Sequence, residues 1–116
     1  MKLVNLVNAI DNLQKLSDML LPAKESFKVV RLLTEIEPQV QNYHLQRNKL
    51  LSKYGDSEDE ITFTIREEEK ESYMKEAIDL ENIEVNLHFE KIKISENLAI
   101  KASDLVNIID FIEIVD

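Results

Sequence analysis

The chain has 116 residues, of which 44% are hydrophobic and 32% charged, with no cysteine and a formal net charge of −9 at pH 7. This length suits a single domain over residues 1–116 with an ordinary core, and the lack of cysteine excludes disulfides and thiolate metal sites. No apolar run approaches the roughly twenty residues that span a bilayer. The first segment is broken by Asn5, Asn8 and Asp11, unlike a signal peptide. We therefore expect a cytoplasmic protein that does not enter a membrane.

The charge is unevenly distributed along the chain. Residues 1–53 hold eight Lys/Arg against five Asp/Glu, a net of +3, whereas residues 54–116 hold six against eighteen, a net of −12. An acidic pole of this kind repels phosphates, which disfavours nucleic acid and anionic membranes as direct ligands. It favours a basic protein partner, or serves only solubility.

Two helices are expected in the first half of the chain. Apolar residues spaced by three and four predict a helix over residues 4–19: Leu3, Leu6, Ile10, Leu13, Leu16 and Leu20. Pro22 fits the first turn of a second helix, where its missing N–H costs nothing. The same spacing marks the apolar face of that helix as far as Tyr54: Val29, Leu33, Ile36, Val40, Tyr43, Leu50 and Tyr54.

Two residues interrupt the second helix pattern. Pro38 lies within it without shifting the register, which predicts one long helix kinked near Pro38, with two helices joined at Glu37 as the alternative. Arg47 is the one charge in the apolar register. Gly55, the only glycine, stands where a left-handed helix cap is expected.

The acidic stretch after Gly55 divides into three parts. Residues 56–60 have loop composition, and Ile61, Phe63 and Ile65 alternate with threonines as in a half-buried strand. Thr64 and Glu67 have the spacing of a capping box. They would begin a helix over residues 67–81 whose buried edge is Tyr73, Ala77 and Leu80.

The last third of the chain predicts one strand and one helix. Val85, Leu87 and Phe89 alternate with polar residues, and Ile92 and Ile94 continue after a slip, as in a bulged strand. Ser103 is a candidate N-cap for a last helix with Leu105, Ile108, Ile112 and Val115 on one face. The expected fold is therefore α+β and mainly helical, in the order α-α-β-α-β-α. A helical hairpin with a long second helix would carry a small antiparallel ribbon and two further helices.

No residues indicate catalysis or a cofactor. A single glycine excludes the glycine-rich phosphate-binding loops. Glu84, His88 and Glu90 would share one strand face and could hold a divalent metal, although a solvent-facing strand has the same composition. Lys24, Lys28 and Arg31 form a basic stripe that we interpret as a solvated helix face, with phosphate contact as the alternative.

Several short motifs together resemble those of small proteins of tailed phages and prophages of Gram-positive bacteria, a family of unknown function. The resemblance covers nearly the whole chain. It rests on Leu21, Pro22, Lys24, Phe27 and Lys28, then Ile36, Glu37 and Pro38, then Arg47, Leu50, Lys53, Tyr54 and Gly55, and finally Asp104, Leu105, Phe111 and Ile112. It implies a phage accessory protein that acts by contact rather than by chemistry, and it implies no site residues.

The leading hypothesis is a non-enzymatic phage-type protein that binds and modulates another protein. The target would be a host defence or nucleic-acid-processing enzyme whose basic groove complements the acidic pole. The candidate contact residues are Glu58, Asp59, Glu60, Glu67, Glu68 and Arg47. The first alternative is a phage virion or assembly component, and the second is a metal-dependent enzyme.

Overall fold

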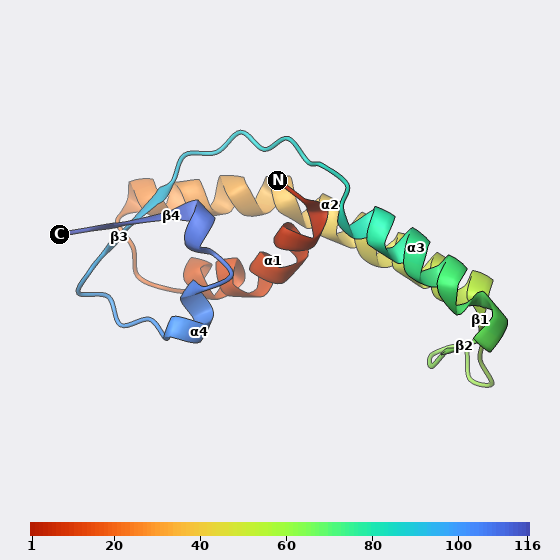
Figure 1. Cartoon of the computed structure of the whole chain (residues 1–116). Coiled ribbons are helices and arrows are strands. Elements are labelled where there is room, and N and C mark those ends of the chain that lie inside the picture. Colours follow the sequence, from red (N-terminus) through yellow and green to blue (C-terminus); the bar gives the residue numbers. More distant parts are fainter.

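The computed structural model describes all residues, 1–116, and its backbone is dominated by a hairpin of two helices. Helix α1 (Leu3–Ser17) lies against the N-terminal half of helix α2 (Ala23–Tyr54), as Figure 1 shows. Both helices follow the predicted apolar spacing except at Leu20, which lies beyond the end of α1 and is fully exposed. Helix α2 continues through Pro38 for 32 residues, which excludes the two-helix alternative. Pro22 is the residue that caps α2 rather than a member of its first turn.

The hairpin and the last third of the chain form the body of the molecule. Strand β3 (Ile92–Ser95) pairs in parallel with β4 (Ile112–Val115), between which lie the one-turn helix α4 (Ala102–Leu105) and a 3-10 turn (Ile109–Phe111). Apolar side chains from all these parts make one core: Leu3, Leu6, Ala9, Leu13, Leu16, Val29, Leu32, Leu33, Ile36, Val40, Tyr43, Val85, Ile92, Ile94, Ile108, Phe111 and Ile112. The parallel pair is held against the hairpin by this core.

The C-terminal half of α2 leaves the body as an arm, which we define as residues 44–84. Helix α3 (Lys70–Glu81), preceded by a 3-10 turn (Glu67–Glu69), runs back along α2. A two-residue antiparallel ribbon, β1 (Gly55–Asp56) and β2 (Thr64–Ile65), closes the far end. The arm explains the elongated shape, 55 × 27 × 21 Å (Figure 1).

The fold class is confirmed: the protein is mainly helical, with a small antiparallel ribbon in an α+β arrangement. No helix has both the length and the apolar character needed to cross a membrane.

The predicted helix caps on either side of the ribbon are wrong. Gly55 is extended (φ −119°, ψ 163°) rather than left-handed, because it pairs with Ile65 in the ribbon. A Cβ at this position would lie 2.7 Å from the carbonyl oxygen of Leu51, so glycine is needed for the close approach of the chains. The Thr64–Glu67 capping box does not form, since Thr64 is committed to β2 and Arg66 precedes the 3-10 turn.

The predicted strands and last helix are only partly right. Ile61 is 84% exposed and lies in the loop, so the expected strand over residues 61–65 is reduced to β2. The segment 85–91 is extended with Val85 buried and Phe89 half-buried, but it pairs with no strand. The last helix is a single turn that Lys101 caps rather than Ser103, and Ile112–Val115 pairs with β3 instead of continuing a helix. Residues that share a helical face by spacing thus form a strand.

Candidate protein-binding site

The arm has no hydrophobic core of its own. Among residues 44–84 only Gly55 is buried, whereas α1 covers the first half of α2. The two arm helices meet through half-buried side chains, including Tyr54 and Tyr73, whose rings pack edge to face with centroids 6.4 Å apart. A two-helix layer of this kind leaves one side of its apolar seam open to solvent.

The open side of the seam contains a hollow of about 220 Å³ around Arg47. Its lining residues are Tyr43, Arg47, Tyr73, Met74, Ala77, Ile78, Leu80 and Glu81. Met74 is 59% and Ile78 49% exposed. The Tyr73 hydroxyl, together with that of Tyr43, raises the pKa of Arg47 despite partial desolvation. Arg47 therefore stays charged beside exposed apolar side chains, a combination that is enriched where proteins bind one another.

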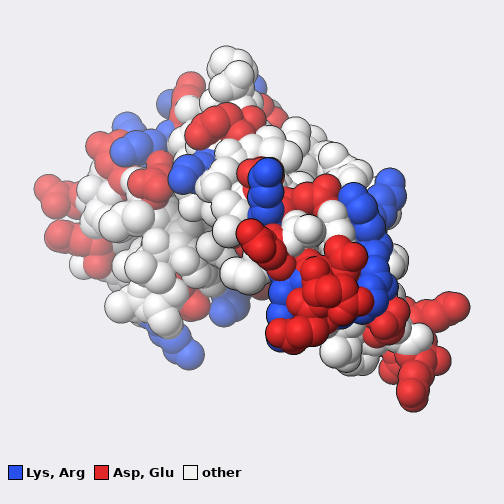
Figure 2. All heavy atoms as spheres, turned by 45° about the vertical axis from the view of Figure 1, so that its right-hand side comes forward, with Lys and Arg blue, Asp and Glu red and all other residues white.

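The end of the arm, residues 55–71, carries eight Asp/Glu against Arg66 and Lys70, and we call it the acidic tip. Arg66 pairs with Asp56 at 3.1 Å and donates to the Lys53 carbonyl at 2.7 Å, and Lys70 pairs with Glu67 at 2.7 Å. No ion pair neutralises the remaining glutamates: Glu58, Glu60, Glu68, Glu69 and Glu71. Figure 2 shows acidic side chains gathered where the arm is turned forward. The tip keeps a net negative surface.

The loop of the tip is held in shape by Asp59. Its carboxylate accepts the N–H of Ile61 at 2.9 Å and of Thr62 at 2.8 Å, and the hydroxyl of Ser57 at 3.0 Å. The Thr62 and Ile61 N–H groups, with Ser57, lower the pKa of Asp59. The adjacent Glu60 takes the left-handed backbone conformation (φ 62°). Asp59 is thus occupied with the loop, and the exposed Glu58 and Glu60 remain available to a partner.

The structure brings most of the predicted contact residues together. Glu58, Glu60, Glu67 and Glu68 are exposed on the acidic tip, and Arg47 lies nearer the body in the seam hollow, about 10 Å along α2 from Tyr54. The sequence interpretation missed Met74 and Ile78. Their four-residue spacing beside Tyr73 and Ala77 was the available signal, since it widens the apolar stripe of α3 beyond the edge that α2 covers.

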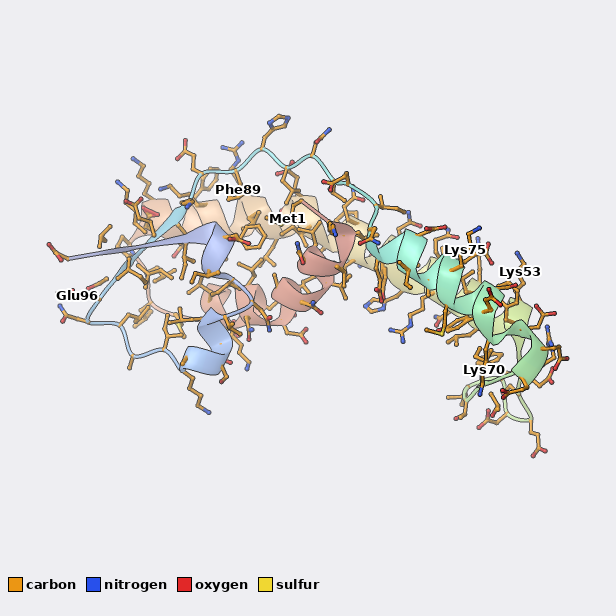
Figure 3. The ribbon with its side chains drawn as sticks, in the orientation of Figure 1. Met1, Lys53, Lys70, Lys75, Phe89 and Glu96 are labelled. Atoms are coloured by element: carbon orange, nitrogen blue, oxygen red, sulfur yellow. The ribbon has the colours of Figure 1, made fainter.

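Lys70 is the one lysine of the acidic tip, and Lys53 and Lys75 lie outside it on α2 and α3 (Figure 3). Lys53 pairs with Glu76 at 3.4 Å and lies 5.0 Å from the ring of Tyr54, while Lys75 forms no ion pair. The pKa of Lys53 is raised by the Tyr54 hydroxyl and by Glu76. These contacts stabilise the α2–α3 pairing without neutralising the tip.

The possible metal ligands do not form a site. Glu84 binds the terminal ammonium of Met1 at 3.1 Å, whereas His88 and Glu90 are exposed on the extended segment. No three His, Cys, Asp or Glu side chains lie close enough together to hold a metal ion.

No protein-family model, curated protein or solved structure matches this chain.

Proposed function

We propose that this chain is a non-enzymatic protein-binding module, of the phage accessory kind that its sequence resembles, and that the arm is its binding surface. The partner would be a protein that presents an apolar patch beside basic residues. A host nucleic-acid-processing or defence enzyme in the bacterial cytoplasm has this chemistry, because a nucleic-acid groove is lined with Lys and Arg.

The observation that carries this proposal is the incomplete burial of the arm. Residues 44–84 extend away from the body, only Gly55 among them is buried, and Met74 and Ile78 are exposed around Arg47. Covering an apolar side chain with a partner stabilises the complex by about 25 cal/mol for each Å² removed from water. A partner seated on the seam would provide that burial.

Charge complementarity supports a basic partner. The arm holds twelve Asp/Glu against six Lys/Arg, and five glutamates of the acidic tip have no counter-charge. Such a surface speeds association with a positive partner through long-range attraction, and salt weakens the effect. The tip would steer the encounter and the seam would hold the complex.

Three variants of the full chain test this assignment. The tip variant changes Glu58, Glu60 and Glu68 to Gln, and the seam variant changes Met74 and Ile78 to Gln. A charge-matched control changes Asp11, Glu96 and Glu113, which are exposed and unpaired on the body, to Asn or Gln. Proteins captured from a bacterial extract would be identified, purified and bound again to each variant at low and high salt.

The proposal predicts a purified basic partner whose association slows with the tip variant and whose dissociation quickens with the seam variant. Arg47→Ala should also quicken dissociation, whereas the control should match the parent chain. Competition by DNA or RNA would place the arm in a nucleic-acid groove, and capture of phage structural proteins would indicate assembly instead. Equal binding by tip, seam and control variants would overturn the arm as the binding surface.

A further inference from the structure

A second hollow lies in the body, at the end of α2 opposite the acidic tip. It has a volume of about 340 Å³ and is lined by Lys24, Phe27, Lys28, Arg31, Leu32, His88, Phe89 and Glu90. One wall is the start of α2 and the other is the extended segment 85–91, which passes along that helix (Figures 1 and 3). We call it the α2 hollow.

The floor of the α2 hollow is apolar and firmly held. Leu32 belongs to the buried core, and the ring of Phe89 packs against that of Phe111 with centroids 5.1 Å apart. Figure 3 shows Phe89 on the extended segment beside α2. Because Phe111 is itself buried, the floor is anchored to the core rather than to a mobile loop.

The α2 hollow also has an exposed aromatic wall. Phe27 is 63% exposed, although it lies on α2 only five residues before the buried Leu32. The guanidinium carbon of Arg31 is 6.0 Å from the centre of the Phe27 ring. A ring beside a cation, both open to solvent, offers a stacking surface next to a positive charge.

The three cations of the α2 hollow have different roles. Lys28 is largely buried: its Nζ lies 3.0 Å from Glu25, donates to the Lys91 carbonyl at 3.2 Å and is 3.9 Å from Glu90. It therefore fastens the extended segment to α2 and sets the width of the hollow. Lys24 and Arg31 form no ion pair and are exposed.

We propose that the α2 hollow binds a small organic anion in which a carboxylate or phosphate is attached to a flat apolar ring. Arg31 and Lys24 would hold the anionic group, and the ring would lie against Phe27 above Leu32 and Phe89. A volume of 340 Å³ falls within the range of small-molecule sites, which combine apolar lining with a few polar groups. Arginine suits this role because its planar guanidinium donates two parallel hydrogen bonds to an oxyanion.

Glu90 is the residue of the α2 hollow whose substitution should strengthen ligand binding rather than weaken it. It is the one acidic residue that lines the α2 hollow, and its side chain is mostly exposed at the rim. A carboxylate there repels an anionic ligand, so Glu90→Gln should strengthen binding. A purely structural role for these residues predicts no such gain.

The direct test is a titration of the full chain, followed by the amide signals in two-dimensional NMR. Phenyl phosphate and benzoate are the probes, and they distinguish a phosphate from a carboxylate ligand. Inorganic phosphate and phenol each carry half of the proposed chemistry. We expect one of the two aryl anions to shift the signals of residues 27–32 and 88–90 and to bind at least about tenfold more tightly than either half alone.

Variants separate the α2 hollow from general attraction to lysines. Arg31→Gln and Phe27→Leu should each weaken binding several-fold, and Glu90→Gln should strengthen it, while the signals outside residues 24–32 and 85–91 stay in place. Lys49→Gln is the matched control, since Lys49 is exposed on α2 far from the hollow. The proposal is overturned if neither aryl anion shifts these signals in the millimolar range, if inorganic phosphate binds equally well, or if Lys49→Gln weakens binding as much as Arg31→Gln.

Discussion

The buried carboxylate of Glu25, on the first turn of α2, accepts the backbone N–H of Lys93 in β3 at 3.1 Å. The same carboxylate lies 3.0 Å from the Nζ of Lys28. Without this contact the outer edge of β3 would present an unpaired N–H to α2, so Glu25 joins the helical hairpin to the parallel strand pair.

Glu25→Gln should destabilise the fold in a pH-dependent way. Burial raises the pKa of Glu25, but the Lys93 N–H and the Lys28 ammonium together bring it below its ordinary value of 4.5. A lowered pKa stabilises the folded state above pH 4.5, and this contribution is lost as the pH falls through the folded-state value. We expect a loss of about 1–3 kcal/mol at pH 7 that shrinks below pH 4.5.

Urea melts of the parent chain and the Gln variant at several pH values would measure this difference. Glu96→Gln, on the exposed turn after β3, is the control and should change little. A gap that stays constant from pH 7 to pH 3 would contradict the assigned ionisation.

Pro38→Ala should raise both stability and helix content. Pro38 has no N–H to donate to the Thr34 carbonyl, and it lies exposed within a continuous helix. Alanine restores that hydrogen bond and removes the proline ring, and proline is up to about 3 kcal/mol less favourable than alanine in a helix interior. Circular dichroism and thermal melts would check it, and a lower midpoint with lost helix would mean that Pro38 supports a bend which the packing requires.

Gly55→Ala should loosen the join between α2 and the ribbon. The new Cβ would meet the carbonyl oxygens of Leu51 at 2.7 Å and Thr64 at 3.2 Å, both of them backbone atoms that cannot rotate away. We expect a loss of about 1–3 kcal/mol by denaturant melting. Ser52→Ala, one turn earlier on the exposed face of α2, should leave stability nearly unchanged. Equal denaturation midpoints for the two variants would show that the ribbon backbone shifts to accommodate the new methyl group without loss of stability.

Glu60→Gly separates the stability of the acidic tip from its proposed binding role. Glu60 has a φ of 62°, which costs a side-chain-bearing residue roughly 1 kcal/mol. Glycine relieves that strain, although it also gains freedom in the unfolded chain. Melting should therefore show unchanged or slightly higher stability, while association with a basic partner slows. Faster association would argue against steering by the tip.

Local periodicity was enough to predict the two long helices. Leu6, Leu13, Val29 and Ile36 are buried as their spacing indicated, and the unshifted register across Pro38 identified one helix rather than two. The alternation of Val85, Leu87 and Phe89 also placed these side chains toward the core correctly. Each of these patterns depends on neighbours within a few residues, so the sequence alone reveals it.

Features that depend on pairing between residues far apart in the chain could not be predicted from the sequence. Ile112 and Val115 fit a helical face, but they pair in parallel with β3, which lies about twenty residues earlier in the chain. Gly55 fits a helix cap, yet the approach of Thr64 decides its conformation. The α2 hollow needs Phe89, some sixty residues after Phe27. The basic stripe on α2 was visible in the sequence, whereas the wall facing it was not.

The lack of buried side chains in residues 44–84 has a consequence for how the molecule unfolds. The body closes around seventeen buried apolar residues, while the arm is joined to it through the uninterrupted backbone of α2 and, at its return, through Leu80, Ile83 and Glu84. Opening α3 from α2 breaks helix-end and ribbon hydrogen bonds but exposes little core, so the free energy of that opening falls below the global one. The amide protons of α3 and the ribbon should exchange with solvent long before those of α1. We therefore expect the chain to unfold as two cooperative units that share one helix.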